Sequence, residues 1–325
     1  MVKLGVLLTQ HHRLLSVAAI LDVFENVNRF SEQDGGGKLF DIHLVSASPP
    51  ASEYGGYPVD SMDQPSLYGL IVVPAFAMED MSQAIDANSR GLEWLQRQYH
   101  AGAEMASVCT GAFLLAAAGL LDQRAATTHM HSARAFARAF PRVKLKEQAI
   151  VTQDNGIYTS GGATSSFHLL LLLVENYCGR SMAIRIAKYF AIDMDREHQT
   201  YFGSFRPVDC TQDQLVSELQ QRIRKHYSSA STIEQLLNGL PASRRNMVRR
   251  FKLMTGYTPI EYLQKTRIEA AKKTLEQSAG GVLESMIAAG YSDEKAFRQL
   301  FKKNVGMTPS AYRSKYNGKS RELYN

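Results

Sequence analysis

The sequence contains few cysteines and no long apolar run. Its three cysteines, Cys109, Cys178 and Cys210, are odd in number and widely spaced, which argues against a disulfide framework and matches no zinc-ligand pattern. We therefore expect reduced thiols. The longest apolar runs, residues 112–121 and 169–174, fall far short of the roughly 20 residues that a membrane helix needs. The N-terminal run VKLGVLL is typical of a strand and not of a signal sequence, so we expect a cytoplasmic protein that does not bind membranes.

Metal-ligand spacings and phosphate-binding loops are equally scarce. The pairs His11 with His12, His129 with His131, and Glu197 with His198 have no spacing that selects a metal. The glycines at 35–37 lie between a predicted helix and a predicted strand, which indicates a flexible loop and not a phosphate cradle. We therefore predict no metal and no cofactor.

The formal net charge of +6 is unevenly distributed. From Leu215 onward there are 20 Lys and Arg residues against 9 Asp and Glu, a net charge of +11, while the preceding part has 17 against 22, a net charge of −5. A basic third joined to a mildly acidic two-thirds predicts a polyanionic partner for the C-terminal part. On charge alone, a solvated basic surface is an equal alternative.

The first two hundred residues alternate strand-like and helix-like segments. Apolar, β-branched runs predict strands at residues 2–8, 40–47, 69–75, 104–108 and 149–160, the last as a hairpin that turns at 154–156. Helical periodicity predicts helices at 16–30, 88–100, 111–121, 133–140, 165–177 and 182–190. This alternation predicts an α/β fold with a mainly parallel sheet covered on both faces.

The length of 325 residues is near the limit for one hydrophobic core, which favours two domains. After about residue 201 the strand signal disappears, and the remainder is helical. We predict an N-terminal domain over residues 1–201, a linker over 202–214 and an all-α domain over 215–325.

The all-α domain spells one phrase twice, as FKLMTGYTPIEY at 251–262 and FKKNVGMTPSAY at 301–312, an offset of 50 residues. Each copy is preceded by a short helix whose apolar positions fall at i, i+3 and i+4. These positions are Ile233, Leu236 and Leu237 in the first copy and Leu283, Met286 and Ile287 in the second. Each copy therefore predicts a helix-turn-helix unit.

Residues typical of helix ends mark the boundaries of both units. Ser243 and Ser292 are suitable N-caps for the two second helices, and Ser231 with Glu234 predicts a capping box on the first short helix. Glycine at 256 and 306 predicts a left-handed residue after each second helix, and proline at 259 and 309 prevents continuation.

The second helix of each unit has a polar, largely basic face. Such a helix fits a DNA major groove, where Arg pairs with guanine, Asn pairs with adenine, and flanking Lys and Arg contact phosphates. The alternative is a solvated face of an α-helical repeat. The predicted DNA-binding residues are Ser243, Arg244, Arg245, Asn246, Arg249 and Arg250 in the first unit, and Ser292, Lys295, Arg298, Lys302 and Lys303 in the second.

From about residue 211 to 316 the sequence resembles the DNA-binding domain of AraC-type transcription regulators. The most specific stretch is IAAGYSDEKAFRQLFKKNVGMTPSAYR, residues 287–313. The resemblance implies two helix-turn-helix units joined by a linker helix, here roughly 260–277, that read two neighbouring groove segments. The first copy departs from the family in its turn, GLPASRRN.

The N-terminal domain contains the phrase EMASVCTGAFLLAAAGLL at residues 104–121. A strand ending at Val108, then Cys109, small residues and a helix have the shape of a nucleophile elbow. A thiol at a helix N-terminus experiences the dipole and free N–H groups, which lower its pKa. A Cys after a strand is otherwise a common packed small residue.

Three stretches, SVCTGAFLLAAAGLLDQRAATTH, YTSGGATSSFHLLLLLVENYCGR and AKYFAIDMDREHQ, resemble the PfpI-like, class I glutamine-amidotransferase-type domain of GlxA-like members of the AraC family. The resemblance implies a flavodoxin-like, doubly wound sandwich with a pocket at the strand ends. The predicted ligand-binding residues are Ser16, Phe76, Cys109, Thr110, Gly111, His129, Gly161, Gly162 and Thr164.

The elbow lacks the partners that would make its thiol catalytic. Ser16 replaces the acidic residue of some PfpI-like enzymes, and Thr110 replaces the His of related peptidase-like proteins, which leaves Asp22 and His129 as the nearest candidates. We therefore predict a sensor pocket and not an enzyme. An amidotransferase or hydratase-type enzyme and a Cys109 redox sensor are the alternatives.

Together these features predict a ligand-responsive transcription regulator, an activator of a catabolic operon for an amino-acid-like or small nitrogen metabolite. Its expected partners are double-stranded operator DNA, a small-molecule inducer, RNA polymerase and a second copy of the chain, because operators are commonly repeated.

Overall fold

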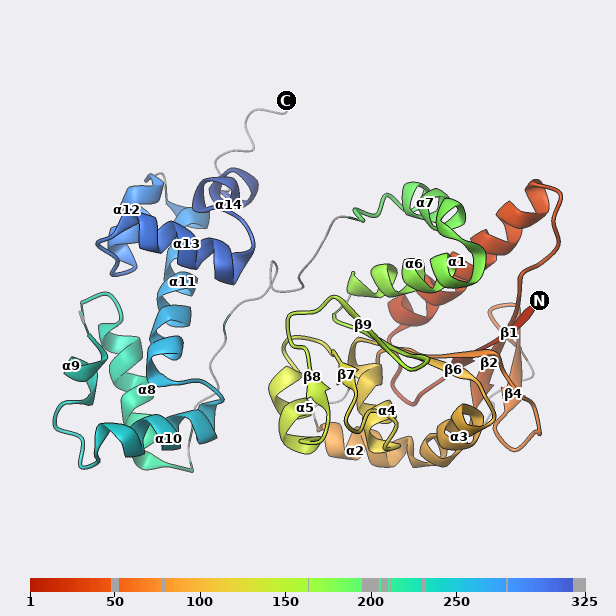
Figure 1. The fold of residues 1–325 in the computed structure, drawn as a ribbon, viewed down its shortest axis with the longest axis horizontal. Helices are drawn as coiled ribbons and strands as arrows, with labels where there is room; N and C mark the ends of the chain where they lie inside the picture. The colour runs from red at the N-terminus through yellow and green to blue at the C-terminus, as the bar shows by residue number, and fades with distance from the viewer. Residues whose placement is uncertain are drawn as a thin grey trace. The chain divides into compact units, whose positions relative to one another are not determined.

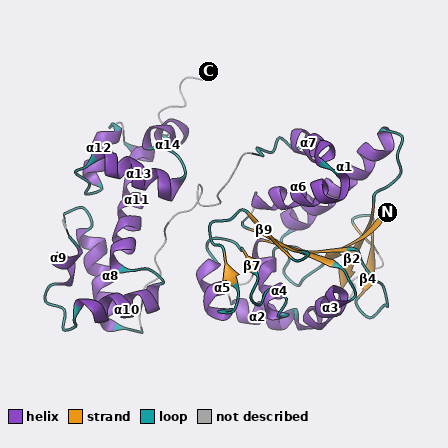
Figure 2. Cartoon of the chain, in the orientation of Figure 1, coloured by secondary structure: helices purple, strands orange, loops and turns teal. Residues whose placement is uncertain are grey.

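A computed structural model describes residues 1–47, 53–77, 80–162, 164–194, 205, 210, 212–229, 232–278 and 280–317 (Figure 1). The chain forms two compact units, Met1–Gln199 and Thr200–Asn325. The linker predicted over 202–214 lies mostly outside the described residues, as do Ser231, Glu197 and His198. In the described part of the chain, strands occur in the first unit and the second unit is helical (Figure 2).

The first unit is built on an eight-stranded sheet with the strand order β3-β4-β2-β1-β5-β6-β10-β9. The strands are β1 (Val2–Leu7), β2 (Phe40–Ser46), β3 (Glu53–Tyr54), β4 (Tyr57–Ser61), β5 (Leu70–Val73), β6 (Glu104–Val108), β9 (Val151–Asp154) and β10 (Ile157–Ser160). All neighbours from β4 to β10 pair in parallel, while β3 and β9 pair antiparallel at the two edges. The predicted mainly parallel sheet is confirmed, and so is the β9–β10 hairpin, which turns through Asn155 and Gly156 with positive φ angles of 48° and 71°.

Helices cover both faces of this sheet (Figure 1). One face packs against α1 (Leu14–Gln33), α6 (Ser165–Cys178) and α7 (Arg180–Tyr189). The other packs against α2 (Met81–Ala87), α3 (Ser89–His100), α4 (Ala112–Ala117) and α5 (Ala133–Ala139). The sequence patterns missed α2, the β3–β4 hairpin and the two-residue strands β7 (Ala125–Ala126) and β8 (Lys144–Leu145), because such short segments carry little periodicity. The predicted sandwich is confirmed.

The second unit contains α8 (Gln214–His226), α9 (Ile233–Leu237), α10 (Arg244–Thr255), α11 (Pro259–Gln277), α12 (Val282–Ala288), α13 (Glu294–Val305) and α14 (Pro309–Tyr316). The pairs α9–α10 and α12–α13 are the two helix-turn-helix units, and α11 is the linker helix. Gly256 and Gly306 end α10 and α13 in the left-handed conformation, with φ angles of 78° and 80°. Pro259 and Pro309 begin the next helices. The helix ends predicted from glycine and proline in the repeat are therefore confirmed.

Two of the predicted caps are wrong by one residue. Ser243 does cap α10, since its side chain accepts a hydrogen bond from the backbone N–H of Asn246. In the second helix-turn-helix unit, however, Asp293 and not Ser292 caps α13. The capping box on α9 is formed by Thr232 and Gln235, and not by Ser231 and Glu234. Several neighbouring residues can cap a helix, so the backbone path decided which one does.

The two helix-turn-helix units bury their short helices, α9 and α12, differently. In the first, α8 packs on α9, and Ile233 is only 8% exposed. The equivalent Leu283 and Ile287 on α12 are 57% and 61% exposed, so of this apolar pattern only Met286 faces the core. The reason is that α8 adds a packing layer to the first unit alone.

No helix within the described residues is long and apolar enough to cross a membrane.

Candidate DNA-binding surface and ligand site

The second helix of each helix-turn-helix unit, α10 or α13, is called its recognition helix. The first of them, α10, is oriented by three buried residues at a spacing of four. Met247, Phe251 and Thr255 face the core. Arg245 and Arg249 consequently lie on the opposite, exposed side, and within the described part of the chain neither takes part in an ion pair. Two guanidinium groups one helical turn apart can contact successive base pairs or phosphates.

Two other arginines of α10 are already engaged. The Arg244 Nη2 atom lies 2.9 Å from Glu234 Oε1, with both side chains mostly exposed. The Arg250 guanidinium binds both carboxylate oxygens of Asp213, at 2.8 and 2.9 Å. Asp213 also accepts hydrogen bonds from the N–H groups of Leu215 and Val216 and so caps α8. Arg250 therefore ties α10 to α8, an arrangement that favours a positioning role over a DNA contact.

The amide of Asn246 is only partly available for base reading. Its Oδ1 atom is buried, with no hydrogen-bond partner among the described residues. Asn246 would have to turn outward before its amide could pair with adenine.

The second recognition helix, α13, repeats the orientation of the first. Its buried residues are Phe297, Phe301 and Val305, each equivalent to a buried residue of α10 at the offset of 50. Lys295, Lys302 and Lys303 are exposed, as predicted. Arg298 is exposed as well, but it forms an i,i+4 ion pair with Glu294.

Two residues of the outward face of α10 were missed from the sequence. Lys252 is exposed and is equivalent to Lys302, so the offset alone could have identified it. Leu253 is 75% exposed, next to the exposed arginines of this helix. An apolar side chain on a recognition helix can contact the methyl group of thymine.

In the N-terminal unit, Cys109 follows β6 in a strained backbone conformation. Its φ angle is 58°, a region that non-glycine residues rarely adopt. Residues Cys109–Gly111 form one 3-10 turn before α4 begins. A side chain at Gly111 would place its Cβ only 2.5 Å from the carbonyl oxygen of Val73. The turn is therefore as tight as the elbow pattern predicts, and only 7% of the Cys109 surface is exposed.

Thr110 joins the elbow to the loop after β5. Its hydroxyl donates to the carbonyl of Phe76 at 2.7 Å and accepts from the N–H of Phe76 at 2.9 Å. Ser16, which is buried on α1, accepts from the N–H of Ala75 in the same loop at 2.9 Å. The residues predicted at 16, 76 and 110 are thus brought together, largely through backbone hydrogen bonds.

His129 packs against the glycine turn that follows β10. A Cβ on Gly162 would lie 2.3 Å from Cδ2 of His129, so glycine is required for this approach. Burial lowers the pKa of His129, and the nearby charges of His131 and Arg13 lower it further. The neutral imidazole is therefore favoured. Arg13 and Thr128, whose hydroxyl donates to the carbonyl of Cys109 at 2.9 Å, are neighbours of this site that the sequence did not single out.

The remaining predicted ligand residues and the candidate carboxylate are placed less favourably. Gly161 donates its N–H to Ile150, and Thr164 is the exposed residue that precedes α6. Asp22 is exposed on α1, and its charge acts on Tyr57, a position that does not suit control of a buried thiol. Among the described residues there is no group of three or more His, Cys, Asp or Glu that could hold a metal ion.

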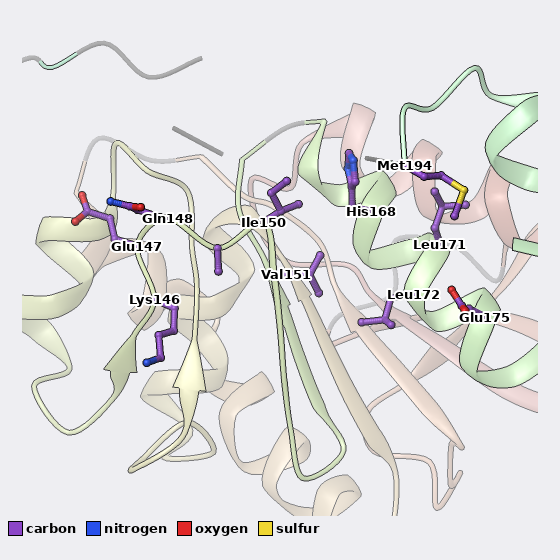
Figure 3. A pocket seen from close by; sticks show the side chains of 11 residues that line it. Lys146, Glu147, Gln148, Ile150, Val151, His168, Leu171, Leu172, Glu175 and Met194 are labelled. Atoms are coloured by element: carbon purple, nitrogen blue, oxygen red, sulfur yellow. The ribbon is translucent and has the colours of Figure 1, made fainter. Parts of the chain in front are cut away.

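A separate groove of about 830 Å³ lies between β9 and α6. Ile150 and Val151 border it on one side, with His168, Leu171, Leu172 and Glu175 of α6 on the other (Figure 3). The ring of His168 contacts the carbonyl of Asp193 at 2.9 Å and holds the end of the described N-terminal unit against α6. The residues predicted to bind ligand lie outside this groove.

Two helix-turn-helix units with basic outward faces define a DNA-binding protein. Residues 236–315 match the family of helix-turn-helix domains, and residues 64–176 match the DJ-1/PfpI family. The chain is 24% identical over 321 residues to the HTH-type transcriptional regulator GbdR of Pseudomonas aeruginosa, which covers 94% of this chain and 83% of that protein.

Two further relatives have similar or higher identity over shorter stretches. The HTH-type transcriptional regulator GlxA of Rhizobium meliloti is 26% identical over 227 residues, 67% of this chain and 68% of that protein. The bifunctional transcriptional activator/DNA repair enzyme AdaA of Bacillus subtilis is 34% identical over 189 residues, 55% of this chain and 86% of that protein. The chain belongs to the AraC-type family of helix-turn-helix transcription regulators, with an N-terminal domain of the DJ-1/PfpI type. It is a DNA-binding transcription regulator.

Proposed function

We propose that this regulator is a cytoplasmic, inducer-responsive activator of a catabolic operon, and that both of its helix-turn-helix units read DNA. The observation that carries the proposal is the shared orientation of α10 and α13. Each buries three residues at a spacing of four and turns basic side chains outward. The relative AdaA is a transcriptional activator by name, which supports activation over repression.

The exposed arginines of α10 provide the direct test. Replacement of Arg245 or Arg249 by Ala should weaken binding by about 1 to 3 kcal/mol, or about 5- to 150-fold, if the side chain reads a base. Arg97→Ala, an exposed arginine of α3 in the other unit, controls for the loss of positive charge. Gel-shift affinities for a duplex selected in vitro by the wild-type chain supply the measurement.

The second unit is tested by the size of the footprint. A chain that reads with both units should protect two groove segments about one helical turn apart, and Lys302→Ala with Lys303→Ala should weaken protection of one of them. Protection of a single segment, unchanged by the lysine substitutions, would show that only α10 reads DNA.

We further propose that the elbow region binds the inducer, an amino-acid-like or small nitrogen metabolite, without covalent chemistry. Cys109 lies at the carboxyl ends of the strands, where doubly wound sheets bind ligands. The N–H groups of Thr110 and Gly111, together with the nearby positive charge of Arg13, favour a carboxylate on the ligand. Ser16, Phe76, His129, Gly161, Gly162 and Thr164 complete the proposed lining.

Cys109→Ser separates binding from chemistry. The substitution changes the size of the side chain little, so inducible transcription should persist with a modest change in the inducer concentration required. A loss of induction with normal folding and DNA binding would indicate a redox or covalent signal. Turnover of the inducer by the purified protein would support the enzyme alternative.

Dimerisation and contact with RNA polymerase belong to the same proposal. A regulator that binds repeated operators gains affinity from a second copy. Sedimentation of the full chain at micromolar concentration should show a dimer, and a monomer under these conditions would remove this part of the proposal.

A further inference from the structure

Arg267 of the linker helix α11 connects the two helix-turn-helix units. Its Nε atom donates a 2.7 Å hydrogen bond to the carbonyl of Tyr227, at the C-terminal end of α8 in the first unit. The same guanidinium lies over the ring of Tyr291, with its central carbon 5.4 Å from the ring centroid. Tyr291 belongs to the turn between α12 and α13 in the second unit. One side chain therefore contacts both units.

The backbone of the two units also meets at this point. Gly290 precedes Tyr291 and has a φ angle of +83°, and a Cβ on it would lie 2.7 Å from the carbonyl oxygen of Ser228 and 2.9 Å from that of Tyr227. A side chain cannot be accommodated against backbone atoms at these distances. The turn of the first helix-turn-helix unit also contains a left-handed glycine, Gly239, with a φ angle of +76°, but a Cβ on Gly239 would meet nothing within 4 Å. The close approach to the backbone at the end of α8 is therefore particular to Gly290.

This contact continues directly to the second recognition helix. The ring of Tyr291 packs on Phe297, with centroids 5.2 Å apart, and Phe297 is one of the three buried residues that orient α13. Burial raises the pKa of Tyr291 to about 12, which agrees with a closely packed junction. A displacement of the Tyr227–Ser228 turn would therefore move Tyr291 and, through Phe297, change the orientation of α13.

The junction matters because the two units have separate hydrophobic cores. One core gathers residues from α8 to the start of α11, and the other gathers residues from the rest of α11 to α14. Both cores include residues of α11, so a contact between the two helix-turn-helix units beside this helix adds a second constraint on their relative angle.

We propose that Arg267 and Gly290 form a clamp that fixes the spacing and angle between the two recognition helices, so that the protein accepts operators of one spacing only. The clamp rests on the proposed reading of DNA by both units. It makes Arg267 and Gly290 positioning residues for DNA recognition, although neither belongs to a recognition helix.

The test compares duplexes that differ only in spacing. A duplex selected in vitro by the wild-type full chain is altered by inserting one or two base pairs between its two protected segments. Each inserted base pair rotates one segment by about 35° relative to the other, so wild type should lose about tenfold or more in affinity, the equivalent of one lost base contact. Arg267→Met and Gly290→Ala should reduce this discrimination to about threefold or less.

Matched substitutions separate the clamp from general damage. Lys273→Met removes a charge from an exposed position of the same helix. Gly239→Ala adds a Cβ to a glycine of nearly the same backbone conformation as Gly290, with a φ angle of +76°, where nothing lies within 4 Å. Both substitutions should keep wild-type discrimination. Circular dichroism checks folding, and if Gly290→Ala fails to fold, Arg267→Met decides the question alone.

Two results would count against the proposal, and they are distinguishable. Each protected segment is randomised in sequence separately. If randomising one of the two leaves wild-type affinity unchanged, reading of DNA by both units is wrong. If both segments matter but Arg267→Met retains the wild-type loss on insertion, the two units read DNA and the clamp is wrong.

Discussion

The hydroxyl of Thr110 is expected to be a main fastening of the elbow. It is the donor and the acceptor of two hydrogen bonds to the backbone of Phe76. Thr110→Val keeps the shape of the side chain but leaves the N–H and C=O of Phe76 without this partner. An unsatisfied buried group costs about 1 to 3 kcal/mol. Both bonds are only partly buried, so we take the lower end for each and expect a loss of about 2 kcal/mol.

Urea unfolding followed by tryptophan fluorescence measures this loss. Trp94 is the only tryptophan of the chain and is buried in the N-terminal unit, so its signal reports on that unit alone. With a denaturant dependence of about 2 kcal/mol per molar urea, the midpoint should fall by about 1 M.

Thr110→Ser is the matched control for this prediction. It retains the hydroxyl and loses one methyl group, which is worth about 0.8 kcal/mol at full burial. A Val midpoint within about 0.3 M of wild type, or a Ser midpoint as low as that of Val, would refute the assignment of the loss to the two hydrogen bonds.

Three other predictions follow. The Arg250 hydrogen bonds lower the pKa of Asp213, so the contribution of Asp213 to stability is complete above its unfolded value of about 3.9 and is lost as the pH falls through the folded value. Melts followed by circular dichroism should therefore show the stability gap between wild type and Asp213→Asn narrowing below about pH 4, and a constant gap would contradict this. Gly162→Ala should displace the His129 ring and raise its pKa toward the ordinary value in an NMR titration, whereas Gly37→Ala, which meets nothing within 4 Å, should leave it unchanged. At the equivalent positions of the repeat, Leu283→Gln should change stability by less than about 0.5 kcal/mol and Ile233→Gln should cost about 2 kcal/mol or more, so similar losses in denaturant melts would contradict the difference in burial.

Much of the fold could be predicted because its signals are local. The offset of 50 residues, the apolar spacing within each helix and the glycine and proline that punctuate them lie within a few residues of the structure they specify. The order of strand, Cys109, Gly111 and helix likewise predicts the tight elbow from neighbouring residues alone. Backbone sterics and helical hydrogen bonds act over one turn, so a sequence read alone can reveal them.

Contacts between residues that are far apart along the chain were decided only by the tertiary structure. Arg250 pairs with Asp213, which lies 37 positions away in the sequence. Because no local pattern reveals this pair, the sequence alone predicted Arg250 as a DNA contact. Leu283 and Ile287 carry the same apolar pattern as the first unit but are exposed, because α8 covers one unit and not the other. The close approaches of Gly290 to Ser228 and of Gly162 to His129 likewise have no signature in the neighbouring residues. The physical reason is that periodicity fixes which side of a helix is apolar, whereas burial depends on which distant segment covers that side.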